Sequence, residues 1–213
     1  MPDRRRKLLA AASLLLCAPW CAATPDFDGE WASNDARYAA NRIFEGADND
    51  GRPFAIVDKK DARIYVFDIA GRLIGASSAL LGSTPGDRSA PDIAGRNPAS
   101  LTPGERTTPT GRFASEPGVN DKGEDIVWFD YDASLAIHRL RPAAAHERRA
   151  ERLASAATDD KRISLGCVVV PVAFYASVVG PILGRQRGVV YVLPEDSPVQ
   201  AMFAAAALRL AAR

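Results

Sequence analysis

Short runs of β-branched and aromatic residues, joined by very short polar connections, constrain the fold of this chain most. Three such runs, at 53–58, 62–68 and 72–81, follow one another with only a few residues between them, among them Asp, Lys and Gly. Within the second run, Ile64 and Val66 alternate with other residues at the two-residue period of a half-buried strand. Closely spaced strands with such connections are typical of β-hairpins, so this part of the chain is expected to form an antiparallel sheet.

The remaining elements extend the same pattern. Further strands are expected at 125–130, 134–138 and 188–193, and helices at 33–46, 143–157 and 171–183. Ser33 or Asn34 is placed to cap the first helix, while Gly180 and Pro181 are expected to end the last. Residues 82–111 are rich in Gly, Pro, Ser and Thr and are expected to be largely loop. A mainly β chain with a few short helices predicts either a β-sandwich or an open barrel.

The first 23 residues have the three-part organisation of a secretory signal peptide. A basic cluster at 4–7 precedes an apolar run at 8–16 that is too short to span a bilayer comfortably. Small residues at 21–23 then suit cleavage before Thr24. We therefore expect export to the periplasm or cell envelope, with an uncleaved membrane anchor as the alternative.

The length left after cleavage, about 190 residues, predicts one main domain with a substantial core. We expect an N-terminal helical segment at 24–50, a main domain at 51–196 and a C-terminal helix at 197–213. This last segment is apolar and rich in alanine, and docking on the domain is favoured over contact with a membrane.

Charge and motifs exclude several classes of function. Removing residues 1–23 takes away four basic side chains and one acidic one, which changes the net charge from +1 to −2. This leaves no basic footprint for nucleic acid, and no later run is long and apolar enough for stable membrane insertion. Residues 48–51 resemble part of a calcium loop but lack ligands at both ends of that loop. No cofactor fingerprint is present, so neither a cofactor nor a metal is expected.

Cys167 is the one cysteine that remains after cleavage, because Cys17 and Cys21 lie in the signal peptide. Cysteines in an oxidising compartment are normally paired, so a lone thiol there indicates a reactive or intermolecular role. The ordinary alternative is a buried, inert side chain. Gly166, which precedes it, has no side chain and lets the backbone approach a substrate and offer amide protons to an oxyanion. We therefore expect an accessible and activated thiol.

A catalytic thiol needs a base, and the sequence holds two histidines. His146 lies among arginines and glutamates in the charged helix expected at 143–157. His138 ends an apolar strand, where neighbouring side chains can hold an imidazole still, and it is the expected base. Its reactive nitrogen is then expected within hydrogen-bond reach of the Cys167 sulfur. The alternative is a structural histidine at a strand end.

These residues resemble the YkuD-type L,D-transpeptidases, bacterial cell-envelope enzymes with a β-sandwich catalytic domain and a Cys–His active site. The resemblance runs from about Pro53 to Glu195 and includes, in order, "TTPTGRF", "LAIH", "RISLGCVVVP" and "GVVYVLPE". It implies that Cys167 is the nucleophile and His138 its base, with the Arg139 carbonyl orienting the imidazole.

By the same resemblance, Ser164 and Gly166 line the site, and backbone amides near the cysteine form the oxyanion hole. Two positions depart from the usual family signature. Leu165 stands where a second histidine is usual, and Val169 stands where an asparagine or arginine is usual. The stretch between base and nucleophile is also long, and its charged part at 141–162 is expected to be either a mobile lid or a passive surface excursion.

The resemblance implies a thioester mechanism on peptidoglycan. The thiolate attacks a stem tetrapeptide at its L-centre and expels the terminal D-alanine. An amine of another stem peptide, an amine of an envelope protein, or water then resolves the thioester. The alternative is a catalytically decayed domain that binds peptidoglycan or an envelope partner. The reason for this alternative is that Leu165 and Val169 are apolar.

Overall fold

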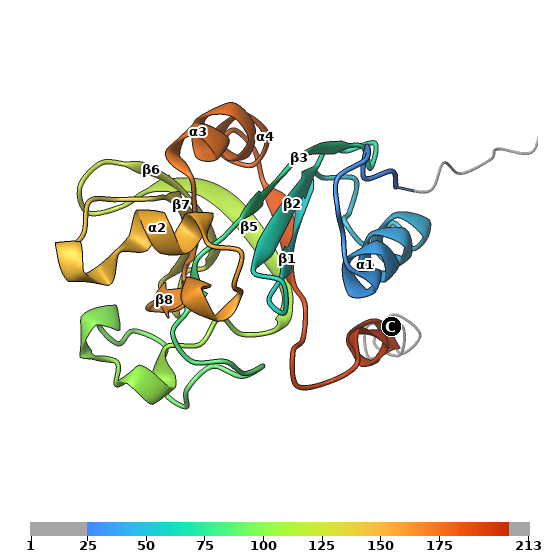
Figure 1. Cartoon of the computed structure of the whole chain (residues 1–213). Coiled ribbons are helices and arrows are strands. Elements are labelled where there is room, and N and C mark those ends of the chain that lie inside the picture. The colour runs from blue at the N-terminus through green and yellow to red at the C-terminus, as the bar shows by residue number, and fades with distance from the viewer. Residues whose placement is uncertain (1–24, 205–213) are drawn as a thin grey trace, which may run out of the picture.

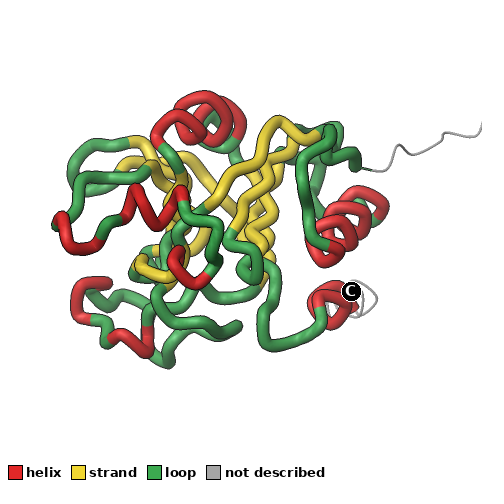
Figure 2. Tube along the Cα trace, in the orientation of Figure 1, coloured by secondary structure: helices red, strands yellow, loops and turns green. Residues whose placement is uncertain are grey.

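The structure is a computed structural model that describes residues 25–204, and the expected signal peptide at 1–23 lies outside these residues. The strands are β1 Phe54–Asp58, β2 Arg63–Phe67, β3 Leu73–Ser78, β4 Leu81–Gly82, β5 Gly111–Val119, β6 Asp125–Asp130, β7 Leu135–Arg139, β8 Arg162–Ser164, β9 Val168–Val170 and β10 Gly188–Val192. The helices are α1 Asn34–Glu45, α2 Arg149–Ala154, α3 Val172–Phe174 and α4 Gly180–Ile182. Strands occupy the middle of the molecule and helices its outside (Figures 1 and 2).

Within the described residues, eight strands form one sheet in the order β3-β2-β1-β10-β5-β6-β7-β9, and β4 pairs with β8. β5 changes partner midway, because Gly111–Ser115 pairs with β10 and Glu116–Val119 with β6. The sheet thereby folds into two layers. Both layers contribute side chains to one core, which includes Ala55, Val57, Ile64, Val66, Val127, Ile137, Val168 and Val190. The chain is mainly β, and the sandwich is the architecture it adopts.

The layer formed by β1, β2, β3 and β10 is covered on its outer face by α1 (Figure 1). Ser33 caps this helix as expected, its hydroxyl accepting a hydrogen bond from the Ala36 N–H at 3.0 Å. The buried side of α1 packs with an aromatic group from the sheet, and residues 199–204, which are helical, add to it. This second core includes Phe27, Ala39, Ile43, Phe54, Phe67, Tyr191 and Phe203. The inner strands β1 and β10 are therefore buried on both faces.

Strand β5 was not expected from the sequence. It contains Pro117 and two glycines, which disfavour strands. Its residues are mostly exposed or half-buried, so no apolar face marks it as a strand. The structure gives the reason for Gly118, because a Cβ there would lie 2.5 Å from the Trp128 ring on β6. The indole therefore rests on bare backbone, which no local pattern reveals.

The two later helices also differ from expectation. The segment at 143–157 forms only a 3-10 turn, Ala145–Glu147, and then α2, since Arg148 between them has a left-handed φ of 49°. The helix from α3 does not end at Gly180 and Pro181 but continues through α4. A π-helical turn, Tyr175–Val179, joins the two and accommodates the proline, which has no N–H to donate.

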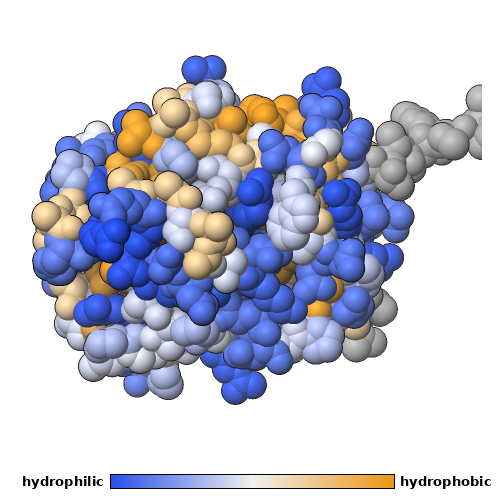
Figure 3. Space-filling view, viewed as in Figure 1, coloured by the Kyte–Doolittle hydropathy of each residue, from blue (hydrophilic) through white to orange (hydrophobic). Residues whose placement is uncertain are grey.

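The surface is largely hydrophilic in the view of Figure 3, with apolar side chains gathered near α3, α4 and β3. Val172 in α3 and Ile74 in β3 are among the exposed apolar residues, at 53% and 39%. Across residues 25–204, no helix combines the length and apolar character needed to cross a bilayer.

A buried ion pair ties the long loop after β4 to the end of the sheet. The Lys59 side chain is fully buried, and its Nζ donates to Asp87 Oδ1 at 2.9 Å. Asp87 also accepts from the Glu195 N–H at 2.8 Å and the Thr110 hydroxyl at 2.7 Å. Burial alone raises the pKa of this carboxyl, but the hydrogen bonds from Glu195, Lys59 and Thr110 hold its pKa well below the usual range.

Replacing Asp87 by Asn is expected to lower the free energy of unfolding by about 3 kcal/mol at pH 7, because Lys59 then stays buried without its counter-charge. A depressed carboxyl pKa contributes stability above its unfolded value of about 4, and this contribution is lost as pH falls. The gap between parent and variant in urea unfolding should therefore narrow below pH about 4. The exposed Asp159→Asn is the control, and an equal loss in both variants would contradict the assignment.

Candidate active site

A tight turn between β8 and β9 positions Cys167. Gly166 in this turn has a φ of 128°, which side chains rarely tolerate. A Cβ at this position would also lie 2.8 Å from Leu135 Cδ2 and 3.0 Å from the Thr107 carbonyl oxygen. Both the backbone conformation and the lack of space therefore require a glycine here. The turn that it forms sets the position of Cys167.

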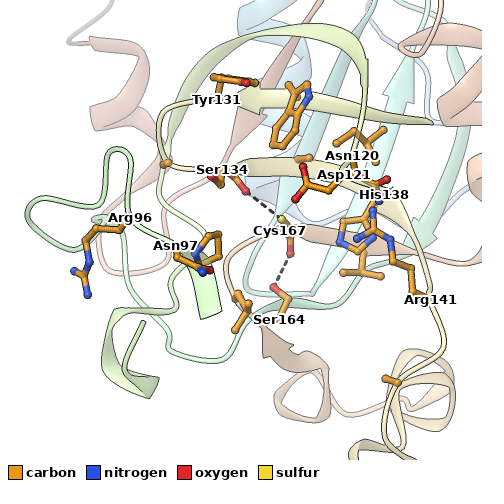
Figure 4. Close-up of a pocket in the computed structure, with 18 of the residues that line it drawn as sticks. Arg96, Asn97, Asn120, Asp121, Tyr131, Ser134, His138, Arg141, Ser164 and Cys167 are labelled. Carbon is orange, nitrogen blue, oxygen red and sulfur yellow. Dashed lines mark hydrogen bonds between the residues drawn. The ribbon is translucent and has the colours of Figure 1, made fainter. Parts of the chain in front are cut away.

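Two hydroxyl groups brace the turn. Ser164 Oγ donates to the Cys167 carbonyl at 2.6 Å and accepts from the Gly166 N–H at 3.1 Å (Figure 4). The buried Thr108 hydroxyl donates to the Gly166 carbonyl at 2.8 Å. The Gly166 N–H is thus occupied, which corrects the expectation that it serves as an oxyanion donor. The Cys167 N–H has no hydrogen-bond partner within residues 25–204.

His138 lies on β7, which runs parallel to β9 with His138 opposite Val169. Its Nδ1 is 2.8 Å from the Arg139 carbonyl oxygen. Because a carbonyl only accepts, Nδ1 carries the proton and Nε2 is left with a free lone pair. The pKa of His138 is lowered to about 4, mainly by burial; the hydrogen bond to the Arg139 carbonyl opposes this shift, and the charges of Arg141 and Arg149 add to it. The imidazole is therefore neutral at pH 7.

Cys167 and His138 line one cavity of about 850 Å³ (Figure 4). The cysteine is free and partly buried. Its thiol donates to the Ser134 carbonyl at 3.6 Å, and the expected hydrogen bond with His138 is not formed between these two described residues. Burial raises the pKa of the thiol, although the Ala136 N–H and the charge of Arg141 lower it in part. Burial therefore favours the neutral thiol in this geometry, and activation of Cys167 stays a prediction.

The structure places the other predicted residues as follows. Leu165 lines the same cavity as Cys167. Val169 also lines it, and its side chain is buried with Leu80 and Leu153. His146 lies exposed on the 3-10 turn before α2 and is not among the residues that line the cavity. Of the two histidines, only His138 shares a cavity with the thiol.

Sequence reasoning missed several residues of the site. Thr108 belongs to the "TTPTGRF" stretch, so its hydroxyl could have been considered for the brace. Ser134 could not, because its role is played by a carbonyl in a turn with a left-handed φ of 57°. Trp128 and Tyr131 form an edge-to-face pair at 5.2 Å on the cavity wall, with Tyr131 71% exposed. The strand pattern indicates where they lie in the chain but not that they meet at the cavity.

The segment at 141–162 forms part of the cavity wall. Its first residues line the cavity, among them Arg141, Pro142, Ala143, Ala144, Glu147 and Arg149. Its later part is anchored, because Leu153 is buried against Val169 and the buried Lys161 donates to the Ser155 carbonyl at 2.6 Å. Whether the segment moves as a lid stays a prediction.

The arrangement suits nucleophilic chemistry at a thiol. A neutral imidazole can take the thiol proton, and a free backbone N–H can meet an oxyanion. Across residues 25–204, no group of three or more His, Cys, Asp or Glu side chains is placed to hold a metal ion.

A scan against models of known protein families finds no match to this chain. A search of curated protein sequences finds none either. Among solved structures, the chain is similar to the helical cell shape determining protein Pgp2 from Campylobacter jejuni, with 12% identity, a TM-score of 0.44, and coverage of 68% of this chain and 49% of that one. It is also similar to the Ldtfm-avibactam carbamoyl enzyme, with 16% identity, a TM-score of 0.38, and coverage of 67% and 49%.

An Enterococcus faecium L,D-transpeptidase matches with 15% identity, a TM-score of 0.35, and coverage of 67% of this chain and 50% of that one. The chain spans about half the length of these structures. At these TM-scores the matches carry no weight for function, and the chemistry has to be argued from the residues of the site.

Alkylation of folded protein by iodoacetamide should be slow at pH 7 and should rise with pH, because burial raises the pKa of the Cys167 thiol. In Leu165→His, an imidazole replaces apolar surface on the same wall, so the midpoint of the alkylation profile should move to lower pH. Leu165→Gln controls for added polarity without a titrating group. An unchanged or raised midpoint in Leu165→His would show that position 165 does not face the sulfur.

Proposed function

We propose that this protein is an exported, cysteine-dependent L,D-transpeptidase that acts on stem tetrapeptides of peptidoglycan, with residues 51–196 as its catalytic domain. The observation that supports it most is a free thiol and a neutral imidazole on the wall of one cavity, with the imidazole oriented by the Arg139 carbonyl. The order of sequence stretches from Pro53 to Glu195, and the signal-like residues 1–23, supply the rest of the support.

The proposed reaction begins when the Cys167 side chain turns from the Ser134 carbonyl toward His138. As Sγ attacks the carbonyl carbon of the L-centre, the thiol proton passes to Nε2, so no free thiolate is needed beforehand. The oxyanion that forms accepts a hydrogen bond from the Cys167 N–H. The tetrahedral intermediate collapses to a thioester, and the imidazolium returns its proton to the departing D-alanine amine.

The second half of the reaction resolves the thioester. An amine attacks the acyl carbon while His138 takes its proton, and the thiol is released on collapse. A stem-peptide amine forms a cross-link, an envelope-protein amine attaches that protein, and water gives an L,D-carboxypeptidase. All three acceptors use the same residues.

A second candidate is a decayed domain that binds peptidoglycan without turnover. The resting thiol is bound to Ser134 rather than to His138, and both Leu165 and Val169 are apolar. Purified protein incubated with tetrapeptide muropeptides and analysed by mass spectrometry separates the two. Loss of alanine, dimer formation or an acyl adduct on Cys167 supports the enzyme, and binding without any of these products overturns it.

The roles of the two histidines can be tested by the same assay. His138→Ala should lower turnover by about 100-fold or more, because the proton acceptor is removed. His146→Ala is the matched control and should retain most activity, since this side chain is exposed outside the cavity. Equal losses in the two variants would rule out the assignment of His138 as base.

The segment at 141–162 can be tested by replacing 144–157 with a short Gly-Ser linker. If the wall contributes to substrate binding or closure, KM for a tetrapeptide muropeptide should rise and turnover should change. Leu153→Ala is a milder variant, which removes the anchor on Val169 but keeps the polar residues of the wall. Unchanged kinetics in both variants would identify the segment as a passive excursion.

A further inference from the structure

Two guanidinium groups stand on the wall that contains the thiol and the imidazole. Arg141 follows β7, and Arg149 begins α2. Both line the cavity with His138 and Cys167, and their side chains are 30% and 23% exposed. Figure 4 shows Arg141 beside His138, on the other side of Cys167 from Arg96 and Asn97.

Each guanidinium is paired with a glutamate and keeps its terminal nitrogens open. Arg149 Nε donates to Glu147, whereas Arg141 Nε lies 2.8 Å from Glu124 Oε2 as an ion pair without a hydrogen bond. The terminal nitrogens of both arginines form no hydrogen bonds with residues 25–204. A planar guanidinium whose terminal N–H groups are unoccupied presents them in the fork geometry that matches a carboxylate.

The positive charge of both arginines acts on His138, opposed in part by the charge of Glu124. Arg141 and Arg149 each act on His138 strongly enough to lower its pKa, and Arg141 does the same for the Cys167 thiol. Of the acidic side chains that line the cavity, Asp121 and Asp132 come from the turns after β5 and β6, whereas Glu147, near α2, is paired with Arg149. The end of the cavity near α2 is therefore the one suited to an anion.

We propose that Arg141 and Arg149 form a subsite that binds the terminal carboxylate of the peptide whose carbonyl Cys167 attacks. This rests on the proposed function, in which the leaving group is a C-terminal amino acid. The leaving residue carries both the amine of the bond that breaks and the free carboxylate. A cationic pair beside the thiol would therefore select the last residue of the stem.

Carboxylate binding would also assist the chemistry. The two arginines disfavour a second positive charge on His138, yet the imidazole has to become positive when it takes the thiol proton. A bound carboxylate neutralises part of the arginine charge and so removes part of this penalty. Substrates with a free terminal carboxylate would then be favoured in the transition state as well as in binding.

The subsite can be tested with two alkylating reagents of similar size, iodoacetate and iodoacetamide, of which only the first is anionic. The ratio of their rates at Cys167 cancels any change in the fraction of thiolate. Arg141→Gln should lower the ratio of iodoacetate to iodoacetamide rates by about tenfold, and Arg149→Gln should lower it by less. Arg141→Lys, which keeps the charge, should restore part of it.

Arg148→Gln is the matched control, because Arg148 lies in the same segment but its side chain is 67% exposed and paired with Glu151. A ratio that is unchanged in the Arg141 and Arg149 variants, or that falls equally in the control, overturns the subsite. The measurement needs no turnover, so it separates the two proposals. A selective fall in the ratio without any muropeptide product supports the subsite and contradicts the transpeptidase proposal. Muropeptide product with an unchanged ratio supports the transpeptidase and contradicts the subsite.

Discussion

The turn at Gly166 is the constraint on which the site depends. Its backbone conformation and the close approach of Leu135 and Thr107 leave no room for a side chain. The hydroxyls of Ser164 and Thr108 then fix the carbonyls and amide of the turn. The position of Cys167, directly before β9, is therefore fixed by the turn. The parallel pairing of β9 with β7 brings it to the cavity that His138 also lines. The relative position of Cys167 and His138 follows from backbone structure rather than from a contact between the two side chains.

Both side chains are uncharged in the resting structure at pH 7. Burial acts in opposite directions on the two pKa values, lowering that of His138 to about 4 and raising that of the Cys167 thiol. A preformed thiolate–imidazolium pair would need both shifts reversed. In the proposed reaction, proton transfer would therefore accompany attack, and a lower cost of forming the imidazolium would accelerate that step. Charge placed on the wall by Arg141 and Arg149 bears directly on that cost.

Local patterns in the sequence were sufficient for much of the fold. The hairpins of β1 to β3 and the capped helix α1 follow from periodicity and capping residues, which act over a few positions. β5 could not be predicted, because its Gly118 makes room for Trp128 on another strand. The pairing of β7 with β9 joins distant parts of the chain, so Cys167 and His138 could be named as partners but their actual hydrogen bonds could not. Backbone groups such as the Ser134 carbonyl leave no signal in the sequence at all.

The apolar Val169, one of the two positions near Cys167 that differ from the family signature, has a physical basis in the segment at 141–162. Val169 is apolar where that signature has a polar residue, and its side chain is buried with Leu80 and with Leu153 of the segment. A polar side chain at this place would lose its hydration against Leu153 without gaining a partner. The same segment brings Arg141 and Arg149 to the cavity wall. The same segment therefore buries Val169 on β9 through Leu153 and supplies the polar groups of Arg141 and Arg149 to the cavity wall.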